Sequence, residues 1–105
     1  MTELKDIYET LRGEGLCSTQ ADFSRNWLGR SDHYMAQIGG DPRKASLTSL
    51  CLLASLLETE TLKAKQAAPA CTYRKIRSAF LTARTICAGV FELRSLHPWD
   101  RITAS

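Results

Sequence analysis

The sequence predicts an all-α fold built from five helices. Apolar residues recur at spacings of three and four along most of the chain, which is the period of one helix face. Capping residues, glycines and prolines separate the helical stretches, and no stretch shows the alternation that marks a strand. With 105 residues and 44% apolar content, the chain is long enough to bury the core of one domain.

The first predicted helix covers about residues 2–12, and Gly13 and Gly15 end it. Its apolar face consists of Leu4, Ile7, Tyr8 and Leu11.

The second predicted helix covers residues 19–28. Thr19 caps it, and Asp22 completes a capping box three residues later. Phe23 and Trp27 lie four residues apart on its apolar side. We expect these two aromatic side chains in the core, rather than on the surface as a platform for stacked bases.

The third predicted helix covers residues 31–38 and follows a tight turn at Gly29. Ser31 is expected to cap it, because a serine oxygen can accept a hydrogen bond from the free N–H groups of the first turn. The segment Gly39-Gly40-Asp41-Pro42 ends it, and Arg43-Lys44 then form a basic loop.

The fourth predicted helix starts after Ser46 and is expected to be central, because it has the widest apolar stripe. This stripe consists of Leu47, Leu50, Leu53, Ala54 and Leu57, with Leu52 and Leu56 beside it. Residues 66–69 are rich in alanine and proline and indicate a break. We therefore divide the single domain into a core over 1–66 and a helical extension over 67–105.

The fifth predicted helix covers about residues 72–95 and is expected to end at Pro98, before a short tail with Trp99. It carries a seam at alternating spacings of three and four, which is typical of a helix packed against another helix. The seam residues are Tyr73, Ile76, Phe80, Ala83, Cys87 and Val90. Two alternatives remain open at this stage: the seam packs back on the first four helices, or it joins two copies in a homodimer.

The cysteines give no sign of a metal site. The sequence contains no Cys-x-x-Cys pair among its four cysteines, which are Cys17, Cys51, Cys71 and Cys87. The two histidines, His33 and His97, do not supply the ligand spacing of a zinc site either. We expect reduced cysteines that act as small apolar side chains, rather than disulfides. Phosphate-binding loops and catalytic motifs are also absent, so we expect no enzyme, no metal and no cofactor.

Charge is unevenly distributed along the chain. The net charge is +3, but residues 1–70 carry a net −1 and residues 71–105 a net +4. The polar N-terminus resembles no signal peptide, and no apolar run reaches the roughly 20 residues of a membrane span. A cytoplasmic protein with no membrane partner is therefore expected.

The hexapeptide Thr19-Gln20-Ala21-Asp22-Phe23-Ser24 resembles the start of the second helix in Cro/CI-type, lambda-repressor-like helix-turn-helix domains. Residues 31–57 also follow the order of this family without gaps, and the resemblance covers about residues 4–58. The stretch 22–31 is in addition similar to short uncharacterised proteobacterial proteins. The family resemblance implies a lambda-repressor-like core and a small bacterial transcriptional regulator that binds operator DNA, as a dimer.

The resemblance also implies which residues contact DNA. Asp32, His33, Ala36 and Gln37 would face base edges, since Gln pairs with adenine, Asp accepts from cytosine, and Ala contacts the thymine methyl group. The full set of expected contacts is Gln20, Arg25, Arg30, Ser31, Asp32, His33, Ala36, Gln37, Arg43 and Lys44. Two departures stand out: the turn is one residue longer than in the family, and the recognition helix contains no Arg or Lys.

Two other functions stay open. A helix-turn-helix scaffold that has lost DNA binding would serve as a protein-interaction module, such as an anti-activator, and the net −1 of residues 1–70 and the position of Asp32 favour it. Alternatively, the last helix alone binds nucleic acid through a stripe of Arg74, Arg77 and Arg84.

Overall fold

The computed structural model describes the backbone of residues 4–104 and the side chains of residues 4–93. Over these residues the chain is helical and contains no strand. The elements, in chain order, are α1 (Leu4–Gly13), α2 (Gln20–Asn26), α3 (Tyr34–Ile38), the short 3-10 helix η1 (Pro42–Lys44), α4 (Leu47–Ala67) and α5 (Ala70–Ala104). The predicted five-helix, all-α fold with a long C-terminal helix is confirmed.

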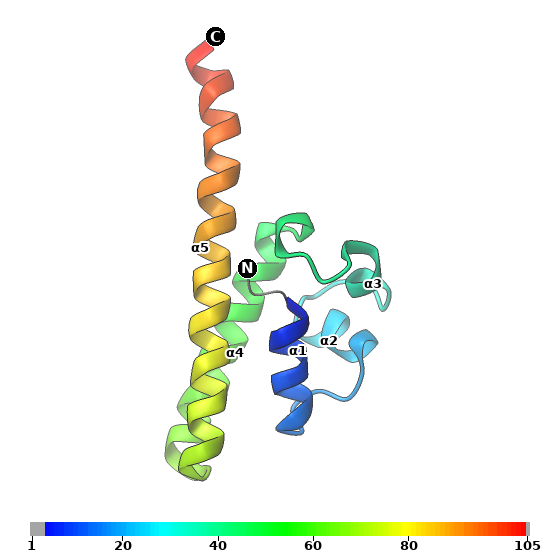
Figure 1. Cartoon of the computed structure of the whole chain (residues 1–105), viewed down its shortest axis with the longest axis vertical. Coiled ribbons are helices and arrows are strands. Elements are labelled where there is room, and N and C mark those ends of the chain that lie inside the picture. Colours follow the sequence, from blue (N-terminus) through cyan, green and yellow to red (C-terminus); the bar gives the residue numbers. More distant parts are fainter. Residues whose placement is uncertain (1–3, 105) are drawn as a thin grey trace.

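The two longest helices form a hairpin that supports the rest of the molecule. α4 and α5 run antiparallel and are joined by residues 68–69. α1 packs against α5, and Figure 1 shows α1 between α5 and the pair α2–α3. α5 continues well past the other helices, which explains why the molecule is 54 Å long but only 27 Å and 21 Å across.

One hydrophobic core joins the four shorter helices to the hairpin. The largest side chains that are almost completely buried are Phe23, Leu4, Ile7, Leu11, Leu28, Leu50, Leu53 and Leu57. Tyr8 of α1 meets Phe23 of α2 edge to face, with ring centroids 5.7 Å apart, a geometry that aromatic rings favour. The predicted apolar faces of α1, α2 and α4 all contribute to this core, and Phe23 and Trp27 are buried in it as expected.

The seam of α5 packs inward. Ile76, Ala83 and Val90 are buried, whereas Tyr73, Phe80 and Cys87 are half-buried. Two further residues, Ala79 and Ile86, are buried beside them. Because α5 contacts mainly α4 and then α1, the seam is occupied within the chain itself.

Three predicted boundaries were wrong. Ser31 does not cap α3: this helix begins at Tyr34, and the side chain of its cap residue, His33, makes no capping hydrogen bond. Arg43 and Lys44 lie in η1 rather than in a loop. α5 does not end at Pro98, because a helix can lose one backbone hydrogen bond, at a cost of about 3 kcal/mol, without stopping.

The break between α4 and α5 is shorter than predicted, because α4 extends to Ala67 and α5 begins at Ala70. Among the described residues, no helix combines the length and the apolar character that a membrane crossing requires.

Candidate functional site

The start of α2 is fixed by hydrogen bonds from short polar side chains. Thr19 Oγ1 accepts a hydrogen bond from the backbone N–H of Asp22 at 3.1 Å, so Thr19 is the cap that the sequence predicts. The Asp22 carboxylate accepts from the backbone N–H of Ser18 at 3.0 Å and from the amide of Asn26. These bonds, the Ser18 backbone N–H first, lower the pKa of Asp22. The capping box therefore forms, but it closes on Ser18 instead of Thr19.

The turn between α2 and α3 is held by backbone geometry and one buried serine. Gly29 has φ +65°, a left-handed conformation that a side chain disfavours. The N–H of Arg30 donates to the carbonyl of Ser24 at 2.9 Å. The Ser24 side chain is completely buried, and its Oγ accepts from the backbone N–H of Met35 at 3.1 Å. This last bond ties the beginning of α3 directly to α2.

α3 is short, buried on one side and exposed on the other. Met35 and Ile38 point into the core. Gly39 adopts φ +61°, and its N–H donates to the carbonyl of Ala36, which ends the helix as predicted. The outer side and the preceding turn expose Ser31, Asp32, His33, Ala36 and Gln37. Five of the predicted contact residues therefore come together on one exposed segment.

The cations around this segment are partly neutralised. Arg25 of α2 lies 3.0 Å from the Asp32 carboxylate, Nε to Oδ1, and both side chains are more than half exposed. Arg43 of η1 pairs with Asp41 at 3.3 Å, and this hydrogen-bonded guanidinium lowers the pKa of Asp41. Over residues 20–44 the chain has four cationic and three anionic side chains, for a net charge of +1.

Arg30 has a structural position that the sequence did not predict. Its guanidinium donates to Ser49 Oγ at 2.9 Å and to Ser46 Oγ at 2.7 Å, so it bridges the turn to the start of α4. It also lies 5.6 Å from the ring centroid of Tyr34, whose hydroxyl accepts from the Ser46 backbone N–H at 2.8 Å. Partners 16 and 19 residues away follow no helical period, so no sequence signal could have identified them.

Gln20 and Lys44, the remaining predicted phosphate contacts, are exposed at the first residue of α2 and the last residue of η1. Ser46 accepts the N–H of Ser49 at 3.1 Å and caps α4 as predicted.

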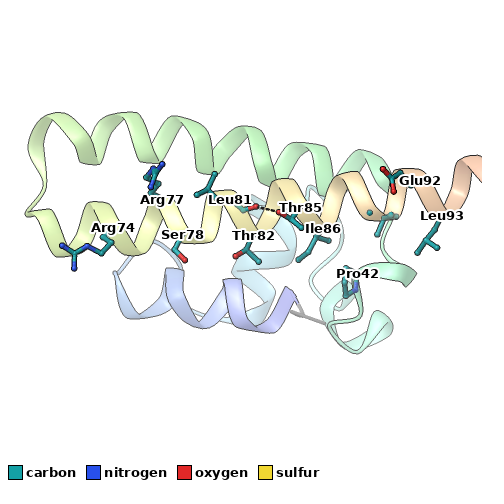
Figure 2. Close-up of a pocket in the computed structure, with 12 residues that line it drawn as sticks. Pro42, Arg74, Arg77, Ser78, Leu81, Thr82, Thr85, Ile86, Glu92 and Leu93 are labelled. Carbon is teal, nitrogen blue, oxygen red and sulfur yellow. Dashed lines mark hydrogen bonds between the residues drawn. The ribbon is translucent and has the colours of Figure 1, made fainter.

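A long groove runs along the outer side of α5. Its volume is about 940 Å³, and it is lined by one stripe of α5 together with Pro42 of η1. Figure 2 shows the arginines Arg74 and Arg77 at one end of this stripe and Glu92 and Leu93 at the other. Leu81 lies between them and is 40% exposed. This apolar surface was not predicted, because the seam, which shares only Val90 with the groove, has the stronger helical period.

The cysteines differ from their predicted environments. Cys17 is buried, as expected for a small apolar side chain, and burial raises its pKa to about 11. Cys51 and Cys71 are exposed, however, and Cys87 is half-buried. Cys51 was expected in the core because its neighbours form the apolar stripe, but it lies on the edge of α4. In the part of the chain with described side chains, no group of three or more His, Cys, Asp or Glu residues could hold a metal ion.

Comparison with known proteins identifies one family and no individual relative. The profile of a family described as a family of unknown function (DUF6626) matches residues 4–100, nearly the whole chain. Neither the search of curated proteins nor the search of solved structures found a match.

Proposed function

The chain belongs to DUF6626, a family of unknown function. We propose that it is a small bacterial DNA-binding regulator that acts in the cytoplasm as a dimer. In this proposal α3 and the turn before it enter the major groove, and no enzymatic activity, metal or cofactor is involved. Control would come from protein concentration, from partners or from the cysteines.

The exposed outer side of α3 is the observation that carries the proposal. A helix that reads DNA must be held rigidly while its outer side chains stay free. Burial of Met35 and Ile38 and the Ser24–Met35 hydrogen bond hold α3. Ala36 and Gln37 remain exposed, and they have the shapes needed to contact a thymine methyl group and an adenine edge.

Phosphate contacts would come from the elements on either side of α3. Arg43 and Lys44 lie in η1, which follows α3 after a turn of three residues, and Gln20 and Arg25 lie on α2. Arg30 is the least available member of the predicted set, because its guanidinium already donates to Ser46 and Ser49. Three cations per protomer are a small number, and two of them already pair with carboxylates, so we expect moderate affinity and a weaker salt dependence than a larger set of phosphate contacts would give.

Dimerisation would use the outer groove of α5, because the seam is already packed against α4 and α1. A second copy fits this groove when its α5 runs antiparallel. The cationic end at Arg74 and Arg77 then faces the anionic Glu92 of the partner copy. Leu81 of each helix faces the open space at Gly89, where an added Cβ would meet no atom within 4 Å. Charge complementarity between the two ends of the groove therefore supports a second copy of this chain as the occupant.

Light scattering on the purified protein tests the dimer. We expect Arg77→Glu and Glu92→Arg each to shift the protein towards monomer, and the double variant to restore the dimer. A monomeric wild-type protein at high concentration, or a double variant no better than the single ones, would remove this part of the proposal.

A salt titration against the DNA upstream of its own gene tests DNA binding. With three phosphate contacts per protomer, the slope of log K against log salt should approach about −5 for a dimer. Lys44→Ala should make the slope shallower by roughly 2, since each of two protomers loses one contact of about 0.9. Lys63→Ala, which removes an exposed lysine from the far part of α4, should leave the slope unchanged.

Asp32→Asn should change DNA affinity in the opposite direction to Lys44→Ala. It removes the charge that pairs with Arg25 and preserves the shape of the side chain, so non-specific DNA should bind more tightly, while a preference for cytosine at the position facing residue 32 should weaken. No detectable binding at low salt would exclude the regulator.

The second candidate function is a protein-interaction module, and the ion pairs favour it. Arg25–Asp32 and Arg43–Asp41 leave the surface around α3 close to neutral, as protein interfaces often are near their centre. A photoreactive residue at position 37 distinguishes the two functions in cells. It should crosslink to nucleic acid if α3 reads DNA and to polypeptide if α3 binds a protein. The third function is a nucleic-acid site on α5 alone, through Arg74, Arg77 and Arg84. Arg84 lies outside the proposed dimer groove, so charge reversal at Arg84 with no loss of DNA binding would count against this function without disturbing the dimer.

A further inference from the structure

Two cysteines from different helices meet at the surface of the hairpin. Cys51 lies on α4 and Cys87 on α5, and their Sγ atoms are 3.4 Å apart. Cys51 is exposed, whereas Cys87 is half-buried behind it. We propose that this pair is a reversible redox site, which a small disulfide such as glutathione disulfide oxidises to an intramolecular Cys51–Cys87 bond.

The geometry favours this pair over the other cysteines. A disulfide joins sulfurs about 2.05 Å apart, so the two Sγ atoms need to approach by little more than 1 Å. Cys17 is buried, and its thiol donates to the carbonyl of Thr19 at 3.4 Å. Cys71 lies in the first turn of α5, at the opposite end of the hairpin from Cys51. Neither has a cysteine on a neighbouring helix in contact with it.

The site is open to a small oxidant. Both sulfurs line a groove of about 540 Å³, together with Arg84 and Phe91 of α5. Phe91 is 56% exposed and provides an apolar side for the incoming molecule.

The reaction proceeds in two exchange steps. The Cys51 thiolate attacks one sulfur of glutathione disulfide, so a Cys51–glutathione bond forms and one glutathione thiolate leaves. Cys87 then loses its proton to water and attacks the Cys51 sulfur, which releases the second glutathione. Together the two protein thiols are oxidised to one disulfide, and one glutathione disulfide is reduced to two thiols.

The different environments of the sulfurs support this order of steps. Burial, with a smaller contribution from the neighbouring Cys51, raises the pKa of Cys87 to about 11. Cys87 is therefore a poor nucleophile towards glutathione disulfide in solution. It attacks effectively only after Cys51 carries the leaving group beside it, where the reaction is intramolecular.

The disulfide would change the hairpin and not the DNA-reading segment. It would connect positions 36 residues apart and fix α5 to α4 near the start of α4. The redox reaction therefore does not require DNA binding by α3, and it can be tested without DNA.

Mass spectrometry of the wild-type protein in glutathione redox buffers tests the site. Oxidation should remove two hydrogen atoms from the protein. Alkylation should then label two free thiols instead of four, and digestion should release a peptide in which Cys51 and Cys87 are linked. Cys87→Ser should stop at a Cys51–glutathione mixed disulfide, because no second thiol resolves it, whereas Cys51→Ser should keep all three remaining thiols. Cys71→Ser is the matched control, because it removes an exposed cysteine and should still lose two thiols.

Two results would overturn the proposal. One is stable mixed disulfides, or bonds between chains, in place of the Cys51–Cys87 bond at the oxidising limit. The other is the same yield of the Cys51–Cys87 bond in native and in denatured protein, because the fold would then contribute nothing to the pairing. Both measurements use the wild-type chain, so a variant that fails to fold does not affect them.

Discussion

The head of the molecule, residues 4–44, and its hairpin, residues 47–104, are stabilised in different ways. In the head, short helices are fixed by single hydrogen bonds, left-handed glycines and a few large side chains such as Phe23. In the hairpin, two long helices pack through a repeated seam, in which small residues such as Ala79 and Ala83 let the helices approach. The head should therefore depend on particular residues, while the hairpin distributes its stability over many similar contacts.

The largest effect is expected for Phe23→Ala in the head. Phe23 is completely buried and meets Tyr8 edge to face, so its loss leaves a cavity and removes a ring contact. We expect the free energy of unfolding to fall by about 3–5 kcal/mol, measured by urea denaturation. Phe91→Ala is the matched control in the hairpin, and because Phe91 is exposed the change should stay within about 0.5 kcal/mol. Equal losses would contradict the comparison.

Ser24→Ala should have the next largest effect. The variant removes the oxygen that accepts from the Met35 N–H and leaves this donor without its partner in the core. The expected loss is about 1–3 kcal/mol. Hydrogen exchange of the Met35 amide should accelerate more than exchange in α4, which would locate the effect in the head. Ser78→Ala, at an exposed helical position, serves as the control and should be nearly neutral.

Glycine-to-alanine substitutions should have opposite signs in the two regions. Gly29→Ala forces a side chain into φ +65° and places its Cβ 2.9 Å from Leu52 Cδ2, so about 1–2 kcal/mol should be lost. Gly89→Ala places a methyl group where no other atom of the same chain lies within 4 Å. In an Arg77→Glu background, which keeps the proposed dimer groove unoccupied, it should add about 0.5–1 kcal/mol. Thermal unfolding of both variants measures the difference. A gain at position 29 would show that the turn does not need its left-handed residue.

The smallest effect is the pH dependence at the start of α2. The pKa of Asp22 is lowered in the folded protein, chiefly by the Ser18 backbone N–H. Because the pKa of Asp22 is lower in the folded than in the unfolded protein, its carboxylate stabilises the fold at every pH above the unfolded pKa, which is near 3.8. This contribution is lost as the pH falls through the folded pKa. Asp22→Asn should therefore reduce stability at neutral pH and flatten its decline below about pH 4. An unchanged acid profile in the variant would show that this cap contributes nothing measurable.

Local patterns of the chain predicted its helices and much of its core. The spacing of Leu4, Ile7 and Leu11 and the cap at Thr19 depend only on neighbours along the chain. For the same reason the seam of α5 was predicted at nearly the right residues. The cap at Ser31 was predicted wrongly, because the turn is one residue longer than usual and α3 begins only at Tyr34.

Tertiary structure alone decided the features that matter for the candidate sites. It placed Arg30 against Ser46 and Ser49, paired Arg25 with Asp32, and turned the α5 seam inward so that a different stripe became the exposed surface. It also brought Cys51 within 3.4 Å of Cys87. These contacts join residues that do not lie on the same helix, and they arise only when separate elements pack. The sequence by itself therefore determined which segments are helical and which side of each is buried, because those properties follow from local spacing, whereas the pairing of charges and thiols across helices follows from packing.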